Sequence, residues 1–283
     1  MLAVIAATLT ALEPELTAVP GTVSVWCGRP DSPAGYSRNP DVAHYAASTM
    51  KVGVMAATYR LADAGRLSLD AEIGVHDDFE SRSGAGTFRN DREYDNDEQP
   101  WERLGGSASL RWLIRRMIVK SSNLATNLVL EQVWARDPEA VAEVWREAGA
   151  KGSVTARGIE DYAAQKTGLT NLVTAADLAA LFAAIRTNRL ASPSSCAEML
   201  EVLLAQEVDD DIVKGLPEGT RAAHKNGWVK GIRHSAALIL PADAPEFVLV
   251  ICVSAPLSEA EGRDLLARIA AAAWTDRNTI AAG

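Results

Sequence analysis

The period of hydrophobic and polar positions changes twice along the chain. Near the N-terminus an amphipathic helix is predicted over residues 2–18, and short β-rich runs follow at 21–27 and 42–45. Near the C-terminus, Gly231 and the proline-bounded turn at 241–245 separate further β-rich runs. These C-terminal elements are predicted as three strands and a closing helix, at 220–229, 234–240, 247–253 and 258–274.

Between these two ends the chain has the period of helices. A helix is predicted over residues 48–64, and Gly65 is a suitable residue just after its end. Thr174 begins a sequence that resembles a capping box. Further helices are predicted at 110–119, 123–133, 138–147, 174–185 and 194–204. Residues 76–106 show no clear period and carry many charges, so a long loop is expected there.

This order of elements predicts an α/β (α+β) fold. One antiparallel sheet, flanked by the terminal helices, would carry an inserted all-helical subdomain. We assign residues 1–47 and 205–283 to the sheet subdomain and residues 48–204 to the helical subdomain, within one integrated domain. A chain of 283 residues is long enough to bury a core without metal ions or disulfides.

Composition and charge narrow the range of partners. The chain has 28 Lys and Arg against 37 Asp and Glu, a formal net charge of −9, which argues against nucleic acid and anionic lipid as partners. The three cysteines show no metal-ligand or redox spacing, which favours a reducing compartment. No basic residue precedes Arg29 and no stretch reaches the ~18 apolar residues that span a bilayer. We therefore expect a cytoplasmic monomer, unless a leader has been removed.

Three short polar motifs carry the candidate chemistry. The first is Ser48-Thr49-Met50-Lys51, the only Ser-x-x-Lys in the chain, at the start of a predicted helix. Residues three apart share one helix face, and a lysine of lowered pKa can serve as the base for a serine nucleophile. The alternative is a serine that caps the helix, followed by a surface lysine.

The other two motifs lie further along the chain. Ser121-Ser122-Asn123 joins two predicted helices, where the side chains either face a cleft or cap a helix. His224-Lys225-Asn226-Gly227 opens a β-rich run and offers a cation, an amide and a close backbone approach. An exposed strand with a β-bulge is the alternative for this third motif.

Together, STMK, SSN and KNG resemble the motifs S-x-x-K, S-D-N and K-T-G of the serine β-lactamase and penicillin-binding protein superfamily, most closely its class A β-lactamases. The segment SSNLATNLVLE also resembles the family's helix, with Asn127 at the second asparagine. The resemblance extends over about residues 5–275. It implies the β-lactamase-like fold and a serine acyl hydrolase that acts on an amide, ester or lactam, with a small-molecule or peptide substrate and with no cofactor or metal.

The resemblance also implies a role for each matched residue. Ser48 would be the nucleophile, Lys51 its base, and Ser121 the relay that passes a proton to the leaving group beside Lys225. The backbone N–H groups of Ser48 and Trp228 would form the oxyanion hole. The substrate-binding residues would be Asn123, Asn226, Gly227, Trp228 and Arg233. Among these, Asn226 and Arg233 are the candidates for a substrate carboxylate.

The chain departs from the family pattern in the loop before Thr174. Class A β-lactamases carry E-x-x-L-N there, and the glutamate activates the water that releases the acyl group. Glu160 is the candidate for this deacylation role, but Ala164 stands where the asparagine is expected. We therefore expect β-lactams to form a long-lived adduct and to be turned over slowly.

Two further readings of the function stay open. One is acyl transfer to an amine or a peptide through the same acyl-serine. The other is a non-catalytic penicillin-binding-like protein, whose signature would be the loss of the serine or of a lysine. A literal K-T-G at 166–168 precedes a predicted helix and is assigned to a loop. The acidic run at 95–98 lacks the EF-hand pattern and is expected to be a solvated loop.

Overall fold

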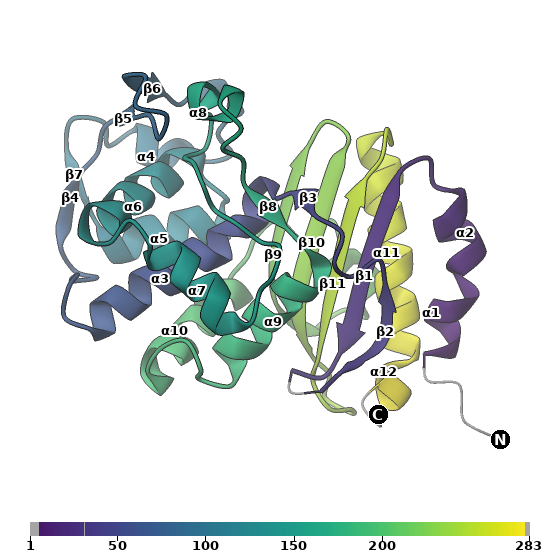
Figure 1. Cartoon of the computed structure of the whole chain (residues 1–283). Coiled ribbons are helices and arrows are strands. Elements are labelled where there is room, and N and C mark those ends of the chain that lie inside the picture. Colours follow the sequence, from purple (N-terminus) through teal and green to yellow (C-terminus); the bar gives the residue numbers. More distant parts are fainter. Residues whose placement is uncertain (1–5, 31, 281–283) are drawn as a thin grey trace.

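The computed structural model describes residues 6–30 and 32–280. A five-stranded sheet stands between two groups of helices (Figure 1). Its strands run antiparallel in the order β2-β1-β11-β10-β9. Their bounds are β1 Thr22–Gly28, β2 Ala34–Arg38, β9 Arg221–Val229, β10 Ile232–Leu240 and β11 Phe247–Ser254. The predicted antiparallel sheet with terminal helices and an inserted helical region is confirmed.

The helices at the two ends of the chain cover one face of the sheet (Figure 1). They are α1 Ala7–Ala11, α2 Glu13–Ala18, α11 Glu259–Thr275 and α12 Arg277–Ile280. The predicted single helix at 2–18 is instead two short helices, because Pro14 stands in the first turn of α2 and suits a new helix start. Residues 2–5 of that prediction lie outside the described residues.

The helical region covers the other face of the sheet. Its helices are α3 Lys51–Asp63, α4 Glu98–Trp101, α5 Leu110–Val119, α6 Asn123–Arg136, α7 Ala140–Ala148, α8 Tyr162–Lys166, α9 Ala175–Arg186 and α10 Pro193–Leu204. Three 3₁₀ turns lie at Ala47–Met50, Arg92–Tyr94 and Val213–Gly215. Among the helices that the structure describes, none is both long and apolar enough to cross a membrane.

Short paired strands tie the loops of the helical region together. They are β3 His44–Tyr45 with β8 Leu172–Val173, β4 Glu72–Gly74 with β7 Ser107–Ser109, and β5 Asp78–Glu80 with β6 Thr87–Arg89. The prediction of one long loop at 76–106 is therefore incomplete, since the segment contains a hairpin and a short helix. Strand β2 was also not predicted. In both places three to five residues are too few to show a period.

Strand β11 packs against a separate hydrophobic core on each face of the sheet. Alternate side chains of a strand point to opposite faces, so a strand covered on both sides is hydrophobic throughout. One set of its side chains packs with the helical region, namely Val248, Val250 and Cys252. The other set packs with the terminal helices, namely Phe247, Leu249, Ile251 and Val253.

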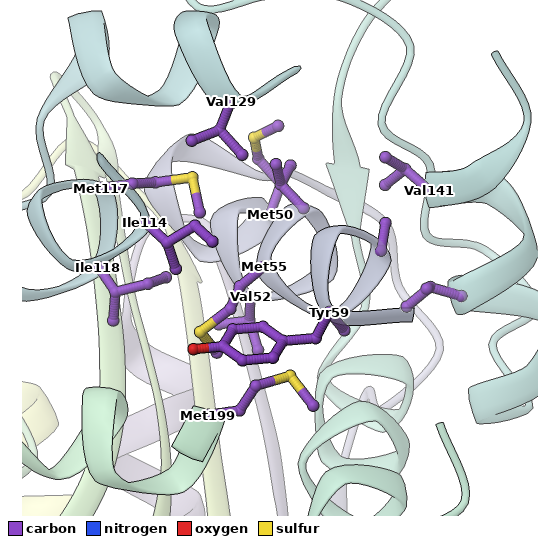
Figure 2. Close-up of a cluster of buried hydrophobic side chains, with 14 of the residues drawn as sticks. Met50, Val52, Met55, Tyr59, Ile114, Met117, Ile118, Val129, Val141 and Met199 are labelled. Atoms are coloured by element: carbon purple, nitrogen blue, oxygen red, sulfur yellow. The ribbon is translucent and has the colours of Figure 1, made fainter. Parts of the chain in front are cut away.

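Helix α3 lies at the centre of the helical region. Figure 2 shows Met50, Val52, Met55 and Tyr59 packed among side chains of the surrounding helices. These neighbours include Ile114, Met117, Ile118, Val129, Val141 and Met199. Because nearly every side of α3 is enclosed, the position of its first turn is set by the core, and that turn carries the Ser-x-x-Lys motif.

Candidate active site

Ser48 lies in the 3₁₀ turn that leads directly into α3. The preceding residue, Ala47, has a φ of 45°, a left-handed conformation that is unfavourable for alanine and that the surrounding structure must impose. The hydroxyl of Thr49 donates to the carbonyl of Ala46 at 2.6 Å and holds the turn. Ser48 is partly exposed and lines a cleft of about 390 Å³. A serine side chain is thus presented to a hollow by a rigid, strained turn.

Lys51 is fully buried one helical turn beyond Ser48. Its Nζ donates to the carbonyl of Ser121 at 2.7 Å and to Oδ1 of Asn123 at 3.0 Å, and it lies 3.4 Å from Oγ of Ser121. Burial lowers the pKa of Lys51 to about 7, although the charges of Asp95 and Glu160 act in the opposite direction. A substantial fraction of this amine is therefore unprotonated at neutral pH and able to accept a proton.

Ser121 joins the second motif to the third. Nζ of Lys225 donates to Oγ of Ser121 at 2.9 Å and to the carbonyl of Asn226 at 2.8 Å. Burial, and then the neighbouring Lys51, lower the pKa of Lys225 well below its usual value. Ser121 itself has a φ of 59°, a second non-glycine residue in the left-handed region. The structure thus brings Lys51, Ser121 and Lys225 together.

The literal K-T-G at 166–168 is not in this cluster. Lys166 is the last residue of α8 and is exposed, and Gly168 has a φ of 92° in the turn that follows. Lys225 lies instead on β9, in the middle of the sheet's edge strand. The prediction that the motif belongs at 225–227 agrees with this placement.

Gly227 allows β9 to lie directly against the turn that holds Ser48. A Cβ atom at this position would lie 2.5 Å from the backbone nitrogen of Ser48 and 3.0 Å from that of Thr49. Only glycine permits so close an approach. The next residue, Trp228, is partly exposed and lines the cleft. The backbone N–H of Ser48 therefore lies beside β9. Trp228, which is predicted to supply the second oxyanion-hole donor, follows Gly227 on this strand.

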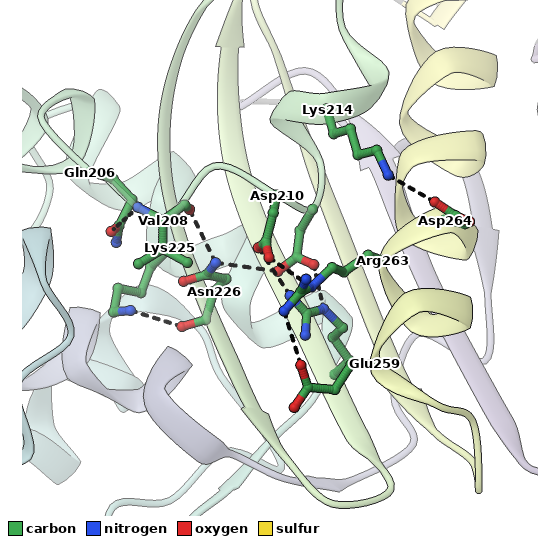
Figure 3. A network of polar contacts seen from close by, with 11 residues as sticks. Gln206, Val208, Asp210, Lys214, Lys225, Asn226, Glu259, Arg263 and Asp264 are labelled. Atoms are coloured by element: carbon green, nitrogen blue, oxygen red, sulfur yellow. Dashed lines mark hydrogen bonds and ion pairs between the residues drawn. The ribbon is translucent and has the colours of Figure 1, made fainter. Parts of the chain in front are cut away.

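Asn226 and Arg233 do not face the cleft with free polar groups, contrary to the expectation that they are available to a substrate carboxylate. The Asn226 amide is buried and donates to the carbonyl of Val208 at 3.1 Å and to Asp211 at 3.2 Å. Figure 3 shows Asn226 within this network, beside Lys225. Arg233 is buried as well and forms ion pairs with Asp210 and Asp211. Buried donors need hydrogen-bond partners, and here protein acceptors take the Asn226 Nδ2 and the Nε and Nη2 of Arg233, while Asn226 Oδ1 is buried with no partner among the residues that the structure describes.

Glu160 lies in the cleft with Ser48. Its carboxylate accepts from the amide of Asn123 at 3.2 Å and from the backbone N–H of Asp91 at 2.7 Å. Burial raises the pKa of Glu160 and outweighs the hydrogen bond from the Asp91 N–H, which acts in the opposite direction. Asn123 donates to Glu160 and accepts from Lys51, so one amide connects the two titratable groups.

The loop around Glu160 is held by Asn127, the second asparagine of the α6 segment. Its Oδ1 accepts from the N–H of Ile159 at 2.8 Å, and its Nδ2 donates to the carbonyl of Ile159 at 2.9 Å and to Asn90 at 2.9 Å. Ala164 is fully buried in α8 and offers no side-chain amide. The loop is thus well anchored next to Glu160, but the amide expected four residues later is missing.

The role of Asp95 as a cap of α6 was not predicted from the sequence. The carboxylate accepts from the N–H groups of Asn123 at 3.0 Å and Leu124 at 2.8 Å, so it caps α6 at the second motif. Asp95 is partly buried, and Asp97 is buried and forms an ion pair with Arg116. The expectation that 95–98 is a solvated loop is therefore wrong for these two residues. No local pattern in the sequence indicates these partners, which lie about 20 to 30 positions away along the chain.

Aromatic side chains line much of the cleft mouth. Tyr45, Tyr94, Tyr162 and Trp228 are among its lining residues, and Tyr94 and Tyr162 are largely exposed. Such surfaces suit an apolar or aromatic group of a ligand. Within residues 6–30 and 32–280, no cluster of three or more His, Cys, Asp or Glu could hold a metal ion.

Comparison with known proteins places this geometry in a family. The model of the "Beta-lactamase enzyme family" matches residues 5–276. Among curated proteins, none matches the chain. The fold is similar to that of PBP-A, with 19% identity, a TM-score of 0.78, and coverage of 95% of this chain and 94% of that one.

Two bacterial β-lactamase structures are similar to the same extent. The enzyme from Sphaerobacter thermophilus shares 26% identity at a TM-score of 0.75, covering 96% of this chain and 95% of that one. The enzyme from Xanthomonas campestris shares 20% identity at a TM-score of 0.79, covering 96% of this chain and 98% of that one. Because the family match spans nearly the whole chain, this protein belongs to the beta-lactamase enzyme family and is a serine hydrolase of the β-lactamase type.

Proposed function

We propose that this protein hydrolyses an amide, ester or lactam through an acyl-enzyme on Ser48. The observation that carries the proposal is the environment of Lys51, a fully buried amine with a pKa of about 7, one turn from a partly exposed serine in a cleft. A lysine with only a structural role gains nothing from a pKa near neutrality, whereas a general base works best there.

Acylation uses the cluster of Ser121 and the two buried lysines. Ser48 Oγ attacks the acyl carbon while its proton passes to Lys51, and two backbone N–H groups stabilise the oxyanion that forms. The bond to the leaving group then breaks. The leaving group takes a proton from Ser121 Oγ, which regains one from the protonated lysines that contact it, Lys225 at 2.9 Å among them.

Glu160 is the general base for deacylation. Its carboxylate removes a proton from a water molecule, the water oxygen bonds to the acyl carbon, and the bond to Ser48 Oγ breaks as the serine regains a proton. Both Glu160 oxygens already accept hydrogen bonds, and Ala164 supplies no amide to help hold the water. This observation favours slow release of the acyl group and makes acyl transfer to an amine the second candidate.

Product analysis distinguishes the two candidates. The protein is incubated with a phenylacetyl thioester, with and without an added primary amine, and the products are separated by mass. Hydrolysis predicts phenylacetic acid as the main product under both conditions. Predominant formation of the phenylacetyl amide would show acyl transfer instead. Reversible binding of the thioester with no release of thiol would support the non-catalytic alternative.

Replacing Lys225 and Lys166, the lysines of the two candidates for the third motif, by alanine tests the motif assignment. Replacing Lys225 by alanine should lower kcat/KM for the thioester by about a hundred-fold, because the Ser121 hydroxyl loses the amine that donates to it. Lys166→Ala removes an exposed side chain at the end of α8 and should leave kcat/KM within two-fold. Steady-state kinetics of the two variants measure both effects. A strong defect in the Lys166 variant with a normal Lys225 variant would reverse the assignment.

A further inference from the structure

Arg233 is held on both sides by carboxylates next to the cleft. Its guanidinium donates to Asp211, which is almost fully buried, and to Asp210 at 3.0 Å. It also lies over the ring of Trp228, with its central carbon 5.6 Å from the ring centroid. Arg233 lines a second hollow of about 360 Å³ whose wall includes Trp228, a residue that the cleft shares. Arg233, the first arginine after the third motif in the sequence, is thus already paired with carboxylates.

The same carboxylates bind further groups. Asp210 forms a second ion pair with Arg263 at 2.7 Å, and Arg263 in turn pairs with Glu259 at 3.0 Å (Figure 3). Asp211 accepts from the Asn226 amide at 3.2 Å. Three carboxylates therefore face two guanidinium groups in this network. The balance is negative at the place where a positive charge would be needed to hold an anionic ligand.

This network adjoins the place where the leaving group of the substrate would depart. In the proposed mechanism the leaving group departs beside Ser121 and Lys225, and Asn226 is the next residue on β9. Strand β10 places Arg233 opposite Trp228 in the register of the sheet. A carboxylate on the leaving group would therefore be directed toward the part of β9 and β10 that carries Asn226 and Arg233, where Val208, Asp210 and Asp211 already accept from the Asn226 amide and from Nε and Nη2 of Arg233.

We propose that Asp210 and Asp211 determine specificity by neutralising Arg233, so that this enzyme prefers acyl donors whose leaving group carries no carboxylate. The substrate class is then a neutral ester, thioester or amide with an apolar or aromatic acyl group. The aromatic side chains at the cleft mouth suit the acyl part of such a substrate. This inference rests on the proposed acylation of Ser48.

Three nearby cations do not replace Arg233. Arg157 lines the cleft, but its guanidinium is buried and donates to the carbonyl of Gly158 and to the hydroxyl of Tyr45. Lys225 is fully buried and donates to Ser121 and to the carbonyl of Asn226, and its lowered pKa reduces the charge that it offers. Lys230 lines the cleft but is exposed on the β9–β10 hairpin, where solvent and salt screen its charge. Neither lysine has the planar guanidinium that binds a carboxylate through two parallel hydrogen bonds.

A matched pair of substrates tests the inference. One is the phenylacetyl thioester of thioglycolate, and the other is the thioester of thioglycolamide, which differs only by having an amide in place of the carboxylate. We expect kcat/KM of the unmodified enzyme to be about ten-fold higher for the neutral thioester, the size of effect that one nearby charge produces. Asp210→Asn removes one negative charge and should bring the two values close to each other by raising that for the acid.

Asp243→Asn is the control, because Asp243 also pairs with an arginine, Arg277, but follows the end of β10 that is opposite to Arg233. The control should keep the ten-fold preference. Asp211→Asn should reduce the preference in the same way; if this variant does not fold, Asp210→Asn decides alone, since Asp210 is partly exposed. A preference of the unmodified enzyme for the acid, lost in Arg233→Ala, would overturn the inference and leave the proposed function standing. Absence of any acylation by either thioester would overturn both.

Discussion

Replacing Lys51 by methionine should slow the acylation of Ser48 by about a hundred- to ten-thousand-fold, the range typical of general-base catalysis. Methionine fills much of the same buried space but cannot accept a proton. Lys51 lies in the first turn of α3, where the core fixes its position, and its amine contacts both Ser121 and Asn123. The measurement is the pre-steady-state rate of thiol release from the neutral phenylacetyl thioester.

The pH dependence of the same rate identifies the group. The pKa of Lys51 is lowered to about 7, so the amine is protonated and inactive as a base below that pH and unprotonated above it. Acylation by the unmodified enzyme should therefore rise about ten-fold per pH unit up to about pH 7 and then level off. The methionine variant should lack this rise. An unchanged rate and profile in the variant would assign the base role to another group.

Replacing Glu160 by glutamine should lengthen the lifetime of the acyl-enzyme about a hundred-fold while leaving its formation nearly unchanged. Glutamine keeps the shape and can still accept the N–H of Asp91, but it cannot remove a proton from water. The lifetime is read from intact-mass spectra of the adduct after removal of excess substrate. Glu93→Gln, an exposed glutamate in the nearby 3₁₀ turn, is the matched control and should behave like the unmodified enzyme.

Penicillin extends this experiment to β-lactams. Because Ala164 gives no amide to position the water, we expect a long-lived penicillin adduct and slow turnover. Turnover on the order of hundreds per second, lost in Glu160→Gln, would show an efficient deacylation device. An adduct whose lifetime is the same in both proteins would mean that Glu160 takes no part in releasing the acyl group.

The three motifs could be predicted from the sequence because their spacing and the surrounding periods agree. Ser48 and Lys51 open a long buried helix, and Lys225 and Gly227 lie on a strand that two further β-rich runs follow in the sequence. The close approach of Gly227 to the Ser48 nitrogen follows from the strand being at the sheet edge, which the order of elements alone does not reveal. The positions of the motif residues could thus be predicted because they lie on or beside long, regular helices and strands.

The partners of individual polar side chains could not be predicted. Arg233 stands on a predictable part of the sheet, but Asp210 and Asp211 reach it from a loop without a period. Asp95 caps α6 from a similar segment, 28 residues before Asn123 in the chain. Such pairings depend on how loops cross the fold, and sequence patterns are short-range. The sequence therefore indicated where Arg233 lies, but only the structure shows that its charge is already paired with carboxylates.

The site of acylation shows directly whether Ser48 is the nucleophile. The unmodified enzyme is mixed with the neutral phenylacetyl thioester, quenched in acid within the acylation phase, digested and mapped by mass spectrometry. We expect one phenylacetyl group on the peptide that contains Ser48, and none on any peptide of Ser48→Ala. An adduct on Ser121 or Ser122, or steady thiol release by Ser48→Ala, would contradict this expectation.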